Sequence, residues 1–134
     1  MNACAILLQQ QSPTALQPWA VLQGRVRDQQ GRHKRKLRIS LTDRCNLRCP
    51  YCMPETPQWL SQAQLLDRAE LKRLITLFVM RLGISQLRLT GGEPLLRKDL
   101  EDCIADLGTL RAHGLERVSL TTNGVLLARR ASSL

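Results

Sequence analysis

The sequence predicts an α/β protein built from three strand–helix units whose strands line a cavity, as in a wide or incomplete barrel. Segments that alternate apolar and polar residues, as strands do, are separated by segments in which apolar residues recur at helical spacing. Each predicted strand is apolar on one face only, and the other faces carry arginine, serine and threonine. Parallel strands covered on both faces are usually apolar throughout. The polar face therefore predicts a cavity filled by solvent or by a ligand.

Length and composition limit the possible classes of protein. The chain has 134 residues, of which 43% are hydrophobic and 23% charged, as is typical of one globular domain. Its formal net charge is +9, and nine basic residues lie between Arg25 and Arg48. Such a block can attract nucleic acid or another anion, or it can be a solvated arm. No apolar run reaches the roughly 20 residues of a membrane span, and the five cysteines do not suggest a disulfide framework, so we expect a cytoplasmic protein without membrane contact.

Residues 1–25 are expected to form a poorly ordered leader, because they are rich in glutamine and show no sustained period. The folded unit is therefore predicted to span residues 26–134. Within it, Asp28 to Arg32 has the composition of a turn, in which Gly31 can adopt a positive φ. The first strand is predicted over Leu37–Leu41, with Leu37, Ile39 and Leu41 on its apolar face and Arg38 and Ser40 on its polar face.

The first helix is predicted between Asp67 and Gly83. Asp67 can cap its N-terminus, Glu70 completes a capping box, and Gly83 is a natural C-terminal stop. The residues expected to face inward recur at helical spacing: Leu71, Leu74, Ile75, Phe78 and Leu82.

Two further strand–helix units follow. The second has a strand over Gln86–Thr90 and a helix over roughly Lys98–Ala112, on whose apolar face Cys103 is expected to be a buried structural thiol. The third has a strand over Arg117–Thr121 and a helix over Val125–Leu134. Right-handed crossovers make the strands parallel neighbours, so the loops that follow them open at one end. The residues expected to line the cavity from these strands are Arg88, Thr90, Ser119 and Thr121.

Three cysteines lie within eight residues directly after the first strand: Cys45, Cys49 and Cys52. Their spacing, with three and then two residues between them, lets one short loop bind three corners of a cubane iron–sulfur cluster. The fourth iron would then stay open, as a catalytic metal position does. The alternative is a structural zinc site, which would need a fourth ligand such as Cys4 or His33.

The loops after the second and third strands carry weaker signals. Residues Gly91 to Pro94 offer close backbone approach and one fixed carboxylate for a cationic amino group, although glycine pairs after strands are often plain turns. Residues Thr121 to Gly124 offer hydroxyls and an amide for ribose or phosphate, or they are only a strand exit with an Asn-Gly turn. Their position at the same end as the cysteine loop strengthens both functional interpretations.

Together these motifs resemble the radical S-adenosylmethionine (SAM) superfamily, in which CNLRCPYC is followed after a strand by GGEP. The longer segments LRISLTDRCNLRCPYCMP, RLTGGEPLLRKDL and LTTNGVLLAR are similar to the GTP 3′,8-cyclase family of molybdenum cofactor (molybdopterin) biosynthesis. The similarity covers roughly residues 26–134. It implies the N-terminal half of a radical SAM core: the first three βα units of a partial (βα)6 TIM-like barrel, truncated before its later strands and before a second cysteine trio.

The resemblance also implies a set of ligands and their contacts. A [4Fe–4S] cluster would be bound by Cys45, Cys49 and Cys52, with SAM at its open iron. The positions implied to contact SAM are Tyr51, Gly91, Gly92 and Glu93. Those implied to contact GTP are Arg38, Arg88 and Thr121. Reductive cleavage of SAM would give a 5′-deoxyadenosyl radical that converts GTP to the cyclic precursor of molybdopterin, and no catalytic residue is assigned.

The absent later strands predict a chain that is inactive alone and has an exposed edge at its third strand, which favours a complementary C-terminal half or a homodimer partner. Two alternatives remain. One is another radical SAM enzyme, acting on a peptide or a tetrapyrrole. The other is a basic nucleic-acid or metal-binding module built on the block from Arg25 to Arg48. Because the chain has one Tyr, one Phe and two Trp, it offers few stacking platforms, and nucleic acid is not an expected partner.

Overall fold

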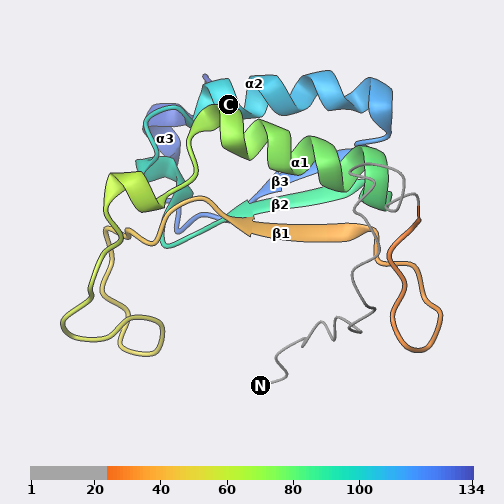
Figure 1. Cartoon of the computed structure of the whole chain (residues 1–134). Helices are drawn as coiled ribbons and strands as arrows, with labels where there is room; N and C mark the ends of the chain where they lie inside the picture. Colours follow the sequence, from red (N-terminus) through yellow and green to blue (C-terminus); the bar gives the residue numbers. More distant parts are fainter. Residues whose placement is uncertain (1–23) are drawn as a thin grey trace.

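A computed structural model describes residues 24–134 and shows a parallel sheet with helices on one face (Figure 1). The sheet has the order β1 (Lys36–Ser40), β2 (Gln86–Thr90) and β3 (Arg117–Leu120), so each strand pairs with its neighbour in sequence. This confirms the predicted α/β fold. Compared with the predicted bounds, β1 begins and ends one residue earlier and β3 ends one residue earlier. Cys4 and almost all of the expected leader lie outside the described residues.

Helix α1 (Arg68–Leu82) has the ends that the sequence predicts. The Asp67 carboxylate accepts a hydrogen bond from Glu70 N at 2.8 Å, and Glu70 Oε2 accepts one from Asp67 N at 3.0 Å. Gly83 ends the helix at φ 70°. Ile75 is fully buried, but Leu74, which was expected to face inward, is 36% exposed. The prediction for Leu74 is wrong because this residue lies about 100° around the helix from Ile75, at the edge of the buried stripe.

The second helix is shorter than predicted. Helix α2 (Leu100–Gly108) is followed by a 3-10 turn, η3 (Thr109–His113), in place of further α-helix. The change occurs where Gly108 lowers helix propensity and the Thr109 hydroxyl donates to the Asp106 carbonyl at 2.7 Å, an alternative to regular helical bonding.

The third helix is also short. The prediction covered residues 125–134, whereas α3 spans only Leu127–Arg130. Gly124 has φ 82° and its carbonyl accepts a bond from Leu127 N at 3.0 Å, so a turn occupies the start of the predicted helix.

The hydrophobic core lies between the sheet and helices α1 and α2. Its central side chains are almost completely buried: Leu41, Leu71, Ile75, Val79, Leu87, Leu89, Leu95, Leu100, Cys103, Leu107, Leu110 and Leu115. Cys103 is 3% exposed, which confirms the predicted buried thiol, and burial raises its pKa. On the surface, Asp106 of α2 accepts bonds from Arg68 and Lys72 of α1 at 2.6 and 3.2 Å. No helix in this part of the chain is long and apolar enough to cross a membrane.

The opposite face of the sheet carries no helix (Figure 1). Arg38, Ser40 and Arg88 are exposed there, as the alternation predicts. Thr90 is an exception, because it is only 6% exposed and its hydroxyl accepts a hydrogen bond from Arg38 Nη2 at 3.4 Å. Thr90 lies at the carboxyl end of β2, where its carbonyl also accepts a bond from Leu41 N at 2.8 Å. The alternation along the strand therefore predicts correctly which face Thr90 occupies, but it does not predict that Thr90 is buried.

Candidate functional site

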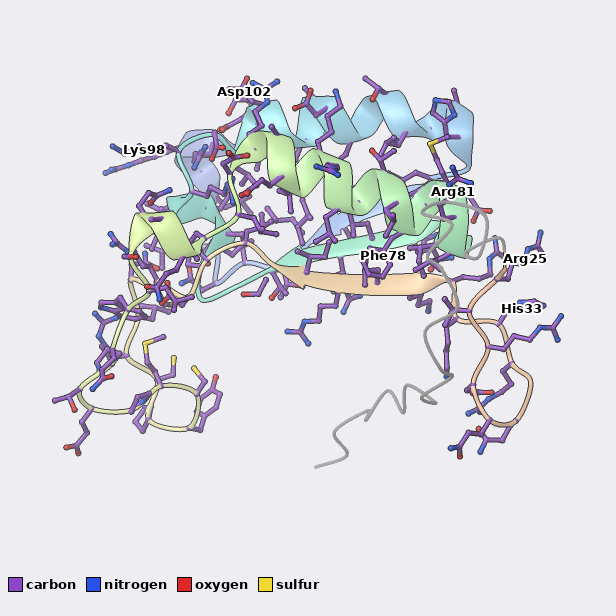
Figure 2. All side chains as sticks on the ribbon, in the orientation of Figure 1. Arg25, His33, Phe78, Arg81, Lys98 and Asp102 are labelled. Carbon is purple, nitrogen blue, oxygen red and sulfur yellow. The ribbon has the colours of Figure 1, made fainter. Side chains whose placement is uncertain are left out.

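The loop between β1 and the 3-10 turn η1 (Gln62–Gln64) contains the three clustered cysteines. It leaves the carboxyl end of β1 and extends below the sheet, on the side without helices (Figure 1). Sulfur atoms gather on this loop (Figure 2). Residues 41–54 are called the cysteine loop below.

The cysteine loop is folded by its own backbone bonds. The amides of Cys52 and Met53 both donate to the Cys49 carbonyl, at 3.0 and 3.1 Å, which forms a tight turn around the last two cysteines. Leu47 N donates to Cys45 Sγ at 3.4 Å. Partial desolvation raises the pKa of Cys52, and the neighbouring Cys49 and Cys45 thiols raise it further. The three free thiols are therefore close to one another, half-buried at Cys45 and Cys49 and exposed at Cys52.

This donor set fits a cluster with three protein ligands. Sulfur is the ligand that iron–sulfur clusters take, and a cubane distributes three thiolates over three separate irons. The ligands of a single zinc ion lie only about 3.8 Å apart, given Zn–S bonds of about 2.3 Å in a tetrahedron. Within residues 24–134, no group of three His, Cys, Asp or Glu side chains is arranged to hold one metal ion. His33, considered as a fourth zinc ligand, lies at the opposite end of the sheet from the cysteine loop (Figure 2).

The glycine pair after β2 packs directly against the cysteine loop. Gly92 N donates to the Thr42 carbonyl and Glu93 N to the Arg44 carbonyl, both at 2.8 Å. A Cβ on Gly91 would lie 2.5 Å from the Thr42 oxygen, and Gly91 has φ 153°. A Cβ on Gly92 would overlap the Arg44 carbonyl oxygen. The predicted close backbone approach is thus present, but its partner is the cysteine loop and was not foreseen.

Glu93 is completely buried at the centre of the three loops. Its Oε1 accepts hydrogen bonds from Leu95 N at 2.9 Å and from the Thr122 hydroxyl at 2.8 Å, and its Oε2 accepts one from Asn123 N at 2.7 Å. The carboxylate therefore joins the loop after β2 to the loop after β3. An amino group from solvent does not reach it in this conformation, and the contact of Glu93 with SAM stays a prediction.

The loop after β3 in turn contacts the cysteine loop. The side-chain amide of Asn123 donates to Asn46 Oδ1 at 2.8 Å and to Cys45 Sγ at 3.8 Å. Asn123 was expected to contact ribose or phosphate, and its contact with the cysteine loop was not foreseen. The sequence did contain a signal for this contact, because loops that follow parallel strands meet at one edge of the sheet.

The uncovered face of the sheet holds a basic cavity of about 330 Å³. Its lining residues are Lys36, Leu37, Arg38, Gln86, Leu87, Arg88, Arg117 and Ser119, and they include no carboxylate. Arg38 and Arg88, predicted to bind substrate, come together here as register partners. Thr121 is exposed just beyond β3 and is not among these residues. Lys36 and Arg117 were missed, although they continue the polar alternation by one step toward the N-terminal end of each strand.

Tyr51 is the most exposed of the large apolar side chains in the cysteine loop, at 91%. Nearby, Arg48 is held against the loop: its Nη1 donates to the Cys45 carbonyl at 2.7 Å, and its guanidinium lies 5.3 Å from the centre of the Trp59 ring. The guanidinium stacking and the carbonyl contact fix Arg48 within the protein. Tyr51, by contrast, is free to contact a ligand.

Comparison with known proteins matches residues 39–134 to the Radical SAM superfamily. The chain is 56% identical over 110 residues to a GTP 3′,8-cyclase of Corynebacterium glutamicum, covering 80% of this chain and 29% of that protein. It is 54% identical over 112 residues to a GTP 3′,8-cyclase of Mycobacterium marinum, covering 83% and 31%. Molybdenum cofactor biosynthesis protein 1 of Dictyostelium discoideum is 51% identical over 108 residues, covering 80% and 17%. The chain thus spans less than a third of the length of these relatives.

Proposed function

Because the chain belongs to the radical SAM superfamily, we propose that residues 26–134 form the N-terminal half of a radical SAM core whose complete form is a GTP 3′,8-cyclase. The observation that carries this proposal is the position of three features. The cysteine loop and the basic cavity lie on or beside the uncovered face of the sheet, and the loop from Gly91 to Pro94 packs against the cysteine loop. Since the chain spans only 29–31% of the bacterial relatives, we expect cyclisation to need residues beyond those it matches, and the chain to be inactive alone.

The residues proposed for the cofactors come from two loops. Cys45, Cys49 and Cys52 would hold a [4Fe–4S] cluster, and radical SAM enzymes use such a cluster together with SAM. When bound, such a cluster would supply the electron for reductive cleavage of SAM. Toward SAM itself, this chain offers the exposed Tyr51 ring and the loop formed by Gly91, Gly92 and Glu93. The bonds from Gly92 and Glu93 to the cysteine loop keep these two groups of residues at a fixed distance.

The residues proposed for GTP are Arg38, Arg88 and Thr121. A guanidinium binds phosphate through two parallel hydrogen bonds, and the cavity adds the charges of Lys36 and Arg117 without any opposing carboxylate. Its volume is at the small end of the range for ligand pockets, so it suits the phosphate end of a nucleotide. Thr121, exposed beyond β3, would contact a part of GTP outside this cavity.

We further propose that the sheet is the start of a partial (βα)6 TIM-like barrel. Among the described residues β3 pairs only with β2, so one edge of the sheet is available to a further strand. This free edge supports assembly with a complementary C-terminal half or with a second copy of the chain. Thiols reserved for a metal cluster also support a reducing location, the cytoplasm.

Cluster binding is tested by anaerobic reconstitution of the chain with iron and sulfide. We expect the brown iron–sulfur absorbance and about four irons per chain, as a [4Fe–4S] cluster requires. The absorbance should disappear in Cys49→Ala and persist in Cys103→Ala, which removes a thiol from the core instead of the loop. Equal iron content in the two variants would contradict the proposal. Nucleic-acid binding that survives loss of the three cysteines would favour the basic-module alternative.

GTP binding is tested by calorimetric titration of the reconstituted chain. Arg88→Ala should weaken binding about tenfold or more, because a charge-assisted hydrogen bond contributes roughly 1.5–3 kcal/mol. Arg111→Ala is the matched control, since it removes the same charge from the exposed turn η3, away from the cavity. If both variants bind GTP as the wild type does while the cluster is intact, the cyclase assignment fails and a radical SAM enzyme with another substrate is favoured.

A further inference from the structure

We propose that Asn123 is a positioning residue for the proposed cluster: the buried Glu93 carboxylate holds the loop after β3 so that the Asn123 side-chain amide donates to Cys45 Sγ. This inference rests on the proposed cluster site. Two contacts join the three loops: Asn123 N donates to Glu93 at 2.7 Å, and Asn123 Nδ2 donates to Cys45 Sγ at 3.8 Å.

The first link is the bond from Asn123 N to Glu93. Glu93 has no exposure to solvent, so its carboxylate depends on protein donors, and hydrogen bonds to a charge are strong in such a medium. The Thr122 hydroxyl donates to the same carboxylate, and its oxygen also accepts a bond from Gly124 N at 3.0 Å. The loop is therefore held on both sides of Asn123.

The second link is the orientation of the Asn123 side chain. Its Oδ1 accepts a hydrogen bond from Val125 N at 3.1 Å, which leaves the Nδ2 hydrogens as the free donors of the amide. These donors meet Asn46 Oδ1 and Cys45 Sγ, both on the cysteine loop. Each polar atom of the side chain thus has a partner, and rotation of the amide would lose all three contacts.

The contact with Asn123 affects the charge on the Cys45 sulfur. Cys45 Sγ has two amide donors, Leu47 N at 3.4 Å and Asn123 Nδ2 at 3.8 Å. Hydrogen bonds to the ligand sulfurs set the reduction potential of an iron–sulfur cluster, because they stabilise the more negative, reduced state. Asn123 is therefore expected to raise the potential of a cluster bound at Cys45.

The test is an anaerobic redox titration of the reconstituted full chain, followed by electron paramagnetic resonance. Asn123→Ala removes the side-chain donor without adding charge, and its backbone N–H to Glu93 remains. At a fixed ambient potential we expect the ratio of reduced to oxidised cluster to fall about tenfold, a shift of about 59 mV to lower potential. Thr76→Val is the matched control, because it removes a hydroxyl that bonds only within α1, and it should leave the potential unchanged.

The role of Glu93 is tested with Glu93→Gln, which preserves size but places an NH2 group against the donors of the loop. Loss of the buried negative charge by itself raises the potential in either background, so the link is measured as a difference between two backgrounds. Glu93→Gln should raise the potential less in the wild type than in Asn123→Ala, because only the wild type also loses the Asn123 contact. Equal shifts in the two backgrounds would overturn the Glu93 link, and an unchanged potential in Asn123→Ala would overturn the inference as a whole. If Asn123→Ala takes up no cluster, hydrogen exchange of the metal-free chain decides.

A wild-type chain that takes up no cluster would contradict the proposed function, and the metal-free protein then tests the contacts themselves. Hydrogen exchange measured by nuclear magnetic resonance should be about tenfold faster for the Asn123 backbone amide in Glu93→Gln, because a protecting acceptor is lost. Exchange of the Asn123 side-chain amide should be faster in Cys45→Ala. Unchanged exchange at either group overturns the corresponding link.

Discussion

Replacement of Glu93 by alanine tests whether the three loops are joined by a buried carboxylate. Among the described residues, Glu93 is the one charged side chain that is buried. Alanine leaves Leu95 N without an acceptor at a residue that is 1% exposed, which costs about 1–3 kcal/mol. The losses at Thr122 and Asn123 are smaller, about 0.5–1.5 kcal/mol each, because these residues can turn toward water. We therefore expect a decrease in the free energy of unfolding of about 4 kcal/mol.

The assay is urea denaturation of the metal-free chain, followed by circular dichroism. The matched control is Glu116→Ala, which removes a carboxylate whose ion pair with Arg35 is more than half exposed and should cost no more than about 1 kcal/mol. Glu93→Gln should fall between the control and Glu93→Ala, since it retains one acceptor oxygen. If Glu93→Ala and Glu116→Ala have the same stability, the Glu93 carboxylate does not hold the three loops together.

Three further predictions concern α1 and its contacts. Asp67→Ala removes the helix cap and should cost about 1 kcal/mol in urea denaturation, whereas no change would show that the capping box is not formed. Ile75→Ala empties a fully buried site and should cost about 2–5 kcal/mol in the same assay. Hydrogen bonds from Arg68 and Lys72 lower the pKa of Asp106 to about 2, so their stabilisation is complete above pH 4 and is lost as the pH falls toward 2. The melting temperature should fall over that range, less steeply in Asp106→Asn.

The sequence predicted correctly those features of the fold that depend on a few neighbouring residues. Asp67 and Gly83 gave the two ends of α1, because a cap and a left-handed glycine depend on their immediate neighbours. Helical periodicity failed at Gly108, since apolar spacing does not distinguish an α-helix from the 3-10 turn that continues the same buried face. The strand faces were correct for the same local reason, because the pleat alternates with a period of two.

The candidate site was predicted less completely because its contacts join distant segments. The sequence indicated that Gly91 and Gly92 permit close approach, but the partner carbonyls of Thr42 and Arg44 lie some fifty residues earlier in the chain. Glu93 was assigned to an incoming amino group, and its internal donors come from the loop after the next strand. Residue type therefore identifies what a group can bind, whereas the fold decides which partner it meets.

The arginines of the uncovered face repel one another, which favours a bound anion there. Arg38 and Arg88 are register partners on strands about 4.8 Å apart, so their like charges destabilise the sheet, and the cavity adds Lys36 and Arg117. A bound polyanion offsets that repulsion. Arg88→Gln should therefore melt at a higher temperature than the wild type without ligand, and GTP should raise its melting temperature less. If Arg88→Gln melts lower than the wild type, Arg88 stabilises the fold itself and charge repulsion on this face does not limit its stability.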